Sequence, residues 1–311
     1  MFLSGRDILS IHDLDPEEVN SLLDFAQDLK SDYIHGGFTP DFLKGQTLGM
    51  IFEKSSTRTR VSFEVGMYQL GGTALFLSNR DLQLGRGEPI KDTARVLSRY
   101  LNGIMIRTFG HDRLVEFAKY ASIPIINGLS DLLHPCQVLT DLLTIREFKG
   151  KHLHNLKMAY VGDGNNMANS YLYGAAKVGM TLTVATPKSY KPNAKVLRQS
   201  AADAKLTGAK LNWTEDPIEA VKDADIVATD TWASMGQEDE HEARKKIFAP
   251  YQVNKELLSH ADKRVIVMHC LPAYRGEEIT EDVFEDNAEI IFEEAENRLH
   301  MQKAILSAVM G

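Results

Sequence analysis

A polar stretch at residues 53–60 carries the residue types that bind a phosphate group. It follows an apolar run and opens a helical pattern, so Ser56, Thr57 and Thr59 would lie at the N-terminus of a helix. Free backbone N–H groups and the positive end of the helix dipole bind anions there, and the guanidinium of Arg58 can grip two phosphate oxygens. The alternative is a capped helix with solvated arginines, and the glycines of a Walker P-loop are missing.

Three further polar residues of the first half follow apolar, strand-like runs. Arg107 ends one such run, and His134 and Gln137 follow the next. Because the carboxyl ends of parallel strands meet at one edge of a sheet, these side chains would share that edge with Ser56. Polar groups there lie at the ligand-binding edge of the sheet, whereas the alternatives are a salt bridge at the rim for Arg107 and a structural role for His134.

The second half carries an amide, a carboxylate and a thiol at corresponding places. Asn166 lies in the stretch at residues 162–170, which is only a weak dinucleotide fingerprint because Met167 replaces its third glycine. Asp230 and Cys270 each follow a strand-like run. An amide suits an amino-acid carboxylate and a carboxylate suits an amine, so this half favours an amino-acid ligand over a nucleotide.

A metal site is the competing interpretation of the histidines and cysteines. His134 and Cys136 lie close together in the first half, and His269 and Cys270 are adjacent in the second. Neighbouring residues on a strand point to opposite faces, so these pairs have poor spacing for tetrahedral coordination. The sequence therefore predicts neither a metal nor an organic cofactor.

Alternating apolar runs and helical patterns must position these residues. Strands are expected at residues 47–52, 73–77, 103–107 and 123–126 of the first half and at residues 157–161, 181–185, 211–213, 225–229 and 264–268 of the second. Helical patterns separate them, which is typical of βαβ units on a parallel sheet. A polar segment near residue 150 divides the two series. We expect an α/β protein with two doubly wound parallel-sheet domains facing a cleft.

Charge and composition exclude several classes of protein. The 311 residues carry a net charge of -8 and contain two cysteines. A nucleic-acid binder needs a basic surplus, and no apolar run approaches the roughly 18 residues that suggest a membrane span. The N-terminal residues lack the apolar run of a signal peptide, so we expect a cytoplasmic protein with reduced thiols.

Taken together, these segments resemble the aspartate/ornithine carbamoyltransferase family over essentially the whole chain. The resemblance rests on Ser56-Thr57-Arg58-Thr59-Arg60, Arg107 and His134-Pro135-Cys136-Gln137 in the first half and on Asp230-Thr231-Trp232-Ala233-Ser234-Met235-Gly236 and His269-Cys270-Leu271-Pro272 in the second. It implies that carbamoyl phosphate is bound by Ser56, Thr57, Arg58, Thr59, Gln83, Arg107, His134, Gln137, Cys270, Leu271 and Arg298. It implies that ornithine is bound by Asn166, Asp230, Ser234 and Met235, and that Arg107, His134, Cys270 and Asp230 take part in catalysis.

The resemblance also implies an activity, a domain assignment and an assembly. Residues 1–149 would bind carbamoyl phosphate and residues 150–293 ornithine, with a C-terminal helix at residues 294–311 packing back on the first domain. The enzyme would transfer the carbamoyl group to the δ-amine of L-ornithine, giving L-citrulline and phosphate. It would be a homotrimer, or a multiple of trimers, in arginine biosynthesis. Catabolic members share these motifs, so the physiological direction stays open.

Two rival functions remain. A carbamoyltransferase that acts on putrescine would share most of the first-half motifs, and the string Ser234-Met235-Gly236 argues against it. A non-catalytic homologue that binds a small anion is the second rival, and the polar sets in both halves argue against that. An aspartate enzyme would need cations for a second carboxylate, whereas Asp230 suits an amine.

Overall fold

The structure is a computed structural model that describes residues 3–36, 40–78, 82, 87–233 and 240–311. The chain forms two compact units. Unit 1 comprises Met1–Leu139 and Arg298–Gly311, and unit 2 comprises Thr140–Asn297. The boundaries fall inside two long helices, α5 (Pro135–Lys149) and α12 (Ala288–Met310), so each of these helices has residues in both units.

Unit 1 is built on a parallel sheet with the strand order β2-β1-β3-β4. The strands are β1 (Thr47–Phe52), β2 (Thr73–Ser78), β3 (Gly103–Arg107) and β4 (Ile125–Leu129). A 3-10 turn at Ile11–Asp13 and the helices α1 (Pro16–Gly36), α2 (Thr57–Gln69), α3 (Ile90–Leu97) and α4 (His111–Tyr120) complete the unit. Helices must alternate with these strands because a parallel pair can be joined only by a long crossover.

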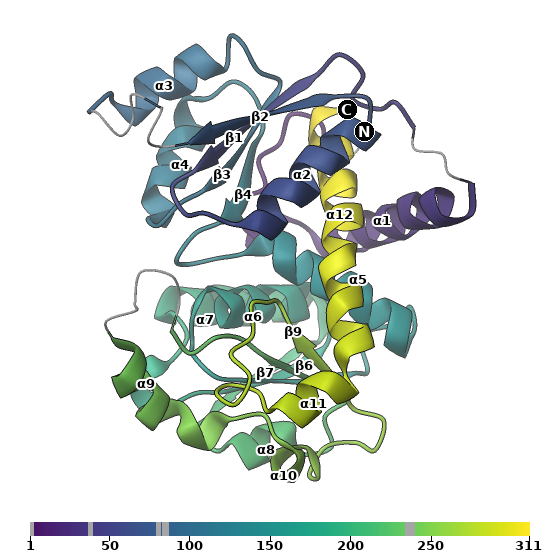
Figure 1. Ribbon diagram of the computed structural model, residues 1–311, viewed down its shortest axis with the longest axis vertical. Helices are drawn as coiled ribbons and strands as arrows, with labels where there is room; N and C mark the ends of the chain where they lie inside the picture. Colours follow the sequence, from purple (N-terminus) through teal and green to yellow (C-terminus); the bar gives the residue numbers. More distant parts are fainter. Residues whose placement is uncertain (1–2, 37–39, 79–81, 83–86, 234–239) are drawn as a thin grey trace. The chain divides into compact units, whose positions relative to one another are not determined.

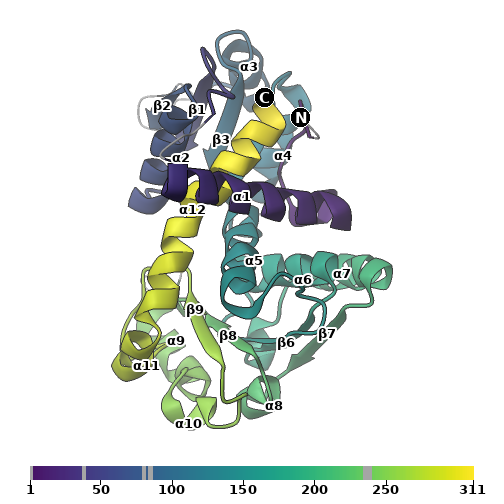
Figure 2. The ribbon, with the colours of Figure 1, turned by 90° about the vertical axis from the view of Figure 1, so that its right-hand side faces the viewer.

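Helices cover both faces of this sheet. α3 and α4 lie on one face, and α2 and the C-terminal part of α12 lie on the other (Figures 1 and 2). Ile51, Ile104, Leu114 and Phe117 belong to the apolar core under α3 and α4. On the other side α12 approaches β3 closely, since a Cβ added to Gly103 would lie only 2.8 Å from the sulfur of a methionine at the end of α12.

Unit 2 is built on a second parallel sheet with the strand order β7-β6-β5-β8-β9. The strands are β5 (Lys157–Val161), β6 (Thr181–Ala185), β7 (Lys210–Thr214), β8 (Ile226–Thr229) and β9 (Ile266–His269). The helices are α6 (Asn166–Val178), α7 (Ala194–Thr207), α8 (Pro217–Val221), α9 (His241–Phe248), α10 (Lys255–Leu258) and α11 (Glu281–Asp286), with 3-10 turns at Lys188–Tyr190 and Ala249–Tyr251. α6 and α7 cover one face of the sheet, and α8 and α10 lie on the opposite face (Figure 2).

The two sheets confirm the expected architecture of two doubly wound α/β domains, and each expected strand is present. Two boundaries differ for identifiable reasons. β4 begins at Ile125 rather than at residue 123, because Pro124 has no N–H to give to a ladder. α12 begins at Ala288 rather than near residue 294, because Ile291 is fully buried and anchors the earlier turns in the core of unit 2. In the described part of the chain, no helix is both long and apolar enough to cross a membrane.

The part of α12 in unit 1 carries buried basic side chains. His300 and Lys303 are fully buried, and the His300 ring lies 5.9 Å from that of Tyr33. Burial, together with the nearby ammonium groups of Lys303 and Lys30, lowers the pKa of His300 to about 3. Burial also lowers the pKa of Lys303 to about 8. The native state therefore keeps His300 neutral at pH values where the unfolded chain protonates it.

This difference predicts an acid-sensitive stability. Between the unfolded pKa of about 6.5 and the folded value, only the unfolded state binds the His300 proton, so the free energy of unfolding falls by roughly 1.4 kcal/mol per pH unit as pH decreases. Between about pH 7.5 and about pH 5, His300 therefore accounts for a loss of about 2 kcal/mol in the free energy of unfolding. In urea unfolding, the free energy of unfolding of His300→Gln should fall by about 2 kcal/mol less than that of the wild type over this pH interval. Equal losses in both proteins would contradict the assignment.

Candidate functional site

The polar side chains named above lie at the switch points of the two sheets. The strand order changes direction between β1 and β3 in unit 1 and between β5 and β8 in unit 2. Doubly wound sheets bind ligands beyond the carboxyl ends of the strands at these points. Ser56 follows β1 and Arg107 ends β3, while Asn166 follows β5 and Asp230 follows β8. Both units therefore present polar groups where this fold binds ligands.

In unit 1, hydrogen bonds join the start of α2, the start of α5 and α12. Ser56 caps α2, because its Oγ accepts from the Thr59 N–H at 3.3 Å and donates to Thr59 Oγ1 at 3.1 Å. Arg298 donates through Nη2 to Thr59 Oγ1 at 2.7 Å and through Nη1 to Gln137 Oε1 at 2.9 Å. Thr59 Oγ1 thus accepts two hydrogen bonds, which leaves its hydroxyl hydrogen for a ligand.

Arg107 and His134 are close to this constellation and are also buried, at 8% and 5% exposure. Burial lowers the pKa of His134 well below its usual range, and the guanidinium groups of Arg298 and Arg107 lower it further. His134 is therefore a neutral imidazole between two permanent cations. A neutral donor beside fixed positive charge can stabilise an oxyanion without first losing a proton to it.

The first turn of α2 supplies the remaining groups expected to bind phosphate. Thr57 and Arg58 are its first two helical residues, so backbone N–H groups without helical partners lie beside their side chains. Gln83 lies outside the described residues.

Glu53 joins the segments that carry the candidate site, a role not predicted from the sequence. Its carboxylate accepts hydrogen bonds from the hydroxyl of Thr108 and, at 2.8 Å, from Nη2 of Arg113. Its backbone N–H donates to the carbonyl of Arg107 at 2.8 Å. Glu53 therefore fastens the end of β1 to the end of β3. The available signal in the sequence was the position of this carboxylate, directly beside the segment expected to bind an anion. A negative charge at that position must be paired with a cation to be tolerated.

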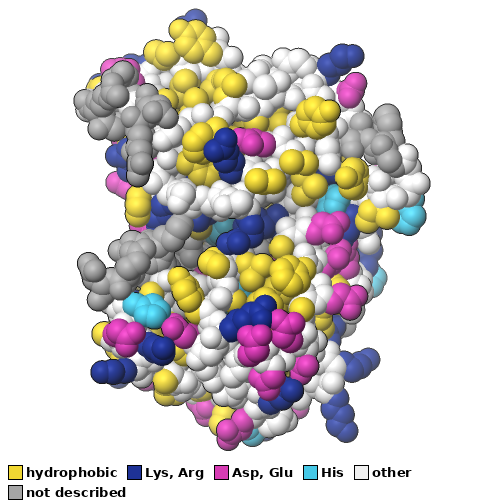
Figure 3. Space-filling view, viewed as in Figure 1, with side chains coloured by type: hydrophobic (Ala, Val, Ile, Leu, Met, Phe, Trp, Pro, Cys, Tyr) yellow, Lys and Arg dark blue, Asp and Glu magenta, His cyan; other side chains and the backbone are white. Residues whose placement is uncertain are grey.

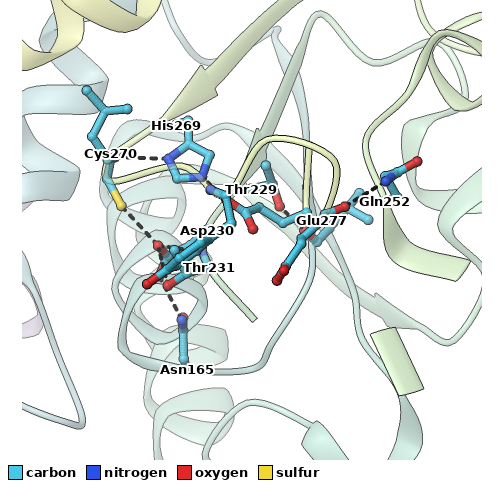
Figure 4. A network of polar contacts seen from close by, with 12 residues as sticks. Asn165, Thr229, Asp230, Thr231, Gln252, His269, Cys270 and Glu277 are labelled. Carbon is cyan, nitrogen blue, oxygen red and sulfur yellow. Dashed lines mark hydrogen bonds and ion pairs between the residues drawn. The ribbon is translucent and has the colours of Figure 1, made fainter. Parts of the chain in front are cut away.

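In unit 2, a hydrogen-bonded network fixes the carboxylate of Asp230 (Figure 4). Oδ1 accepts from the Thr231 N–H at 2.8 Å and from the Cys270 thiol at 3.3 Å. Oδ2 accepts from Nδ2 of Asn165 at 2.8 Å. The side-chain amide of Asn165 has a fixed orientation, because its Oδ1 caps α6 and accepts from the Tyr160 hydroxyl at 3.2 Å. Asn165 was not predicted as a site residue, although its place before a helix is that of an N-cap.

Cys270 is a donor in this network. Burial raises the pKa of its thiol well above the usual range, and the carboxylates of Asp230 and Glu294 raise it further. The thiol is therefore protonated at neutral pH and is neither a nucleophile nor a base. Its place in the network is that of a hydrogen-bond donor to Asp230.

His269 holds the backbone that follows Cys270. Its Nε2 lies 2.9 Å from Glu278 Oε1, and both side chains are fully buried. Its Nδ1 accepts from the N–H of Leu271 at 2.9 Å. Leu271, expected to contact carbamoyl phosphate, has the left-handed φ of 58° and is half-buried. The sequence marked His269 only as a metal ligand, so its positioning role was missed.

The metal interpretation does not fit these side chains. Both ring nitrogens of His269 are engaged within unit 2. The Cys136 thiol donates to the carbonyl of Asn127 at 3.4 Å, and burial raises its pKa to about 12. Across the described residues, no group of three His, Cys, Asp or Glu side chains could hold a metal ion.

The last predicted ligands of the amino acid are described in part. Asn166 is the first residue of α6, directly after the capping Asn165, and is half-buried. Ser234 and Met235 lie outside the described residues.

Comparison with known proteins bears on both units. Residues 6–147 match the model of the aspartate/ornithine carbamoyltransferase carbamoyl-P binding domain, and residues 154–309 match that of the Asp/Orn binding domain. The chain belongs to the aspartate/ornithine carbamoyltransferase family. Within this family it is 57% identical to an ornithine carbamoyltransferase of Oceanobacillus iheyensis, with 99% of this chain and 95% of that protein covered.

Solved structures of the family are equally similar. An ornithine carbamoyltransferase from Pyrococcus furiosus matches with a TM-score of 0.96 and 51% identity, covering 100% of this chain and 99% of that one. An anabolic ornithine carbamoyltransferase from Campylobacter jejuni matches with a TM-score of 0.91 and 46% identity, covering 97% of each chain. The family and its fold are therefore shared over the whole chain.

Proposed function

We propose that this enzyme transfers the carbamoyl group of carbamoyl phosphate to the δ-amine of L-ornithine, releasing L-citrulline and phosphate. The observation that carries the proposal is the pairing of Arg298 with Thr59 and Gln137 in unit 1. It gathers fixed charge and polar donors beside a helix N-terminus, as a small acyl phosphate requires. The fixed carboxylate of Asp230 in unit 2 supports an amino acid as the acceptor.

The groups of unit 1 divide between the two ends of carbamoyl phosphate. Ser56, Thr57 and Arg58, with the backbone N–H groups of α2, hold the phosphate. Thr59, Arg107 and His134 contact the carbamoyl oxygen, and Gln137 orients the carbamoyl amide. Attack on the carbamoyl carbon makes a tetrahedral oxyanion, which buried donors stabilise more strongly than water does. The carbon–oxygen bond to phosphate then breaks, the departing phosphate takes up the proton that the attacking nitrogen releases, and the phosphate leaves from the cradle that already binds it. Gln83 is retained as a further proposed contact.

The groups of unit 2 bind the amino acid. Asp230 binds an amino group and Asn166 the carboxylate, with Ser234 and Met235 as further proposed contacts. A lysine-like amine has a pKa of about 10.4, so it must lose a proton before it can attack. Cys270 remains a thiol beside Asp230, and with Leu271 it faces the reacting carbamoyl group in this proposal.

We also propose a homotrimer, or a multiple of trimers, acting in the cytoplasm in arginine biosynthesis. β2 is an edge strand of unit 1, and its Leu75 and Phe76 are 44% and 39% exposed. Val61 and Tyr68 on the neighbouring α2 are also exposed, and Figure 3 shows hydrophobic side chains on the face that carries α2. An uncovered strand edge with apolar side chains is a usual site of subunit contact. Native mass spectrometry tests the assembly, and a monomer would contradict it.

Ornithine should be the preferred acceptor in a panel with putrescine, lysine and aspartate. Putrescine lacks the carboxylate assigned to Asn166, and a hydrogen bond to a charged group contributes about 1.5–3 kcal/mol. We therefore expect kcat/KM for ornithine to exceed that for putrescine by roughly 10- to 150-fold. Colorimetric ureido assay and phosphate release measure both products. Equal rates with ornithine and putrescine would contradict the assignment of a carboxylate-binding site. If no amine gave a product, the result would favour a non-catalytic binding protein.

A further inference from the structure

Arg244 is a buried arginine outside the site described above. It lies on α9, and its side chain is only 4% exposed. The guanidinium carbon is 4.7 Å from the ring centre of Tyr190 and 5.2 Å from that of Phe248, so it packs against two aromatic rings that also contact each other. Burying a guanidinium is costly unless its N–H groups find acceptors, so its partners are informative.

Those partners come from two different segments. Nη2 donates to the carboxylate of Asp163, which follows β5, and Nε donates to the carbonyl of Trp232, which follows β8. Nη1 lies 3.6 Å from a carboxylate oxygen of Glu240. β5 and β8 pair with each other, and the strand order of unit 2 changes direction between them. One side chain thus joins the two segments that leave the switch point.

The same two segments carry the groups proposed to bind the amino acid. Asn165 and Asn166 follow Asp163 on the first segment, and Asp230 precedes Trp232 on the second. The side chains of Asn165 and Asp230 join these segments directly, through a hydrogen bond of 2.8 Å. Arg244 adds a second link to the same pair of segments, made through charge-assisted bonds.

We propose that Arg244 is a positioning residue for the amino-acid substrate, holding the segments of Asn166 and Asp230 at the spacing that ornithine requires. The inference rests on the proposed function. The partners of Arg244 given above all belong to unit 2, so it should act on the amino acid alone. The planar guanidinium of arginine can donate to a carboxylate and a carbonyl at the same time. The single ammonium group of a lysine could make only part of these hydrogen bonds.

Kinetics of Arg244→Gln and Arg244→Lys test the proposal. KM for ornithine should rise about 10- to 100-fold in Arg244→Gln, because small misplacement of binding groups is costly, while KM for carbamoyl phosphate stays within about 2-fold. Arg244→Lys should recover part of the loss. Arg264→Gln is the matched control, since Arg264 is also in unit 2 but 88% exposed. Equal changes in both KM values with a lower melting temperature would reduce Arg244 to a structural residue, and unchanged KM values would also overturn the proposal.

The pH profile gives a second, independent readout. Burial raises the pKa of Asp163 to about 6, against the opposing effect of Arg244. The other charged or titratable groups around this pair are Asp230, Tyr160, Tyr190 and Glu240. Acid below about pH 6 should protonate Asp163, release Arg244 and raise KM for ornithine.

Asp163→Asn separates this effect from the titration of the other groups. Its KM for ornithine should already be high at neutral pH and should rise less toward acid than that of the wild type, because the amide carries no charge to lose while the ornithine amine titrates equally in both proteins. A rise identical to that of the wild type would assign the titration elsewhere and contradict the role of the pair. Failure of the wild type to form citrulline would instead refute the proposed function, so the two outcomes are distinguishable.

Discussion

Arg107→Gln should lower kcat by about 10²–10³-fold while the protein keeps its fold, the loss expected when one preorganised oxyanion donor is removed. Arg107 ends β3, is 8% exposed and is close enough to His134 to lower its pKa. Glutamine keeps a polar side chain, although a shorter one, and loses the fixed charge. Because the charge acts on the developing oxyanion, KM for carbamoyl phosphate should change much less than kcat.

Two controls separate this effect from general damage. Arg107→Lys retains the charge without the fork and should lose less activity than Arg107→Gln. Arg95→Gln removes an exposed arginine of the same unit, paired with Asp92, and should keep normal kcat. The histidine provides a structural check, because loss of the Arg107 cation should raise the pKa of His134 toward its usual range. Near-normal turnover of Arg107→Gln would return Arg107 to the role of a salt bridge at the rim.

The fold could be predicted where local patterns decide it. β3 and β5 have the predicted bounds because apolar runs bounded by glycine or polar residues are buried on both faces of a parallel sheet. The start of α12 could not be predicted, because it depends on the burial of Ile291 in a core assembled from distant segments. Boundaries set by tertiary packing carry no short-range signal.

The site divides in the same way. The residue types of the α2 string and the places of Arg107 and Asp230 follow from local patterns. The bond from Arg298 to Thr59 joins residues 239 positions apart, so only the family resemblance indicated Arg298 in advance. The sequence singled out Asn166, whereas the structure gives the bond to Asp230 to its neighbour Asn165. The geometry of the helix cap decides which of the two adjacent amide side chains faces the carboxylate. The residue types alone do not indicate that geometry.

Asp230→Asn should reduce kcat/KM for ornithine by roughly 100-fold, equivalent to about 3 kcal/mol for a hydrogen-bonded charge. The substitution changes almost no volume, so the effect comes from the lost charge and the changed hydrogen-bond polarity. Three donors converge on Asp230: the Thr231 N–H, the Cys270 thiol and the amide of Asn165. An asparagine amide has one oxygen and must direct its NH2 group at one of these donors. Asp262→Asn, at a half-buried surface carboxylate of unit 2, is the control for the same chemical change.

The double variant Asp230→Asn with Asn165→Asp separates the polarity of the network from the position of its charge. It restores an acceptor opposite the new amide, and the carboxylate introduced by Asn165→Asp can still cap α6, because it accepts the same backbone N–H groups. Its melting temperature should return toward that of the wild type. Its activity should stay low, because the charge that binds the amino group of ornithine has moved off residue 230. Recovery of both properties would mean that Asp230 serves only to organise the network, and the amino group of ornithine would then need another partner.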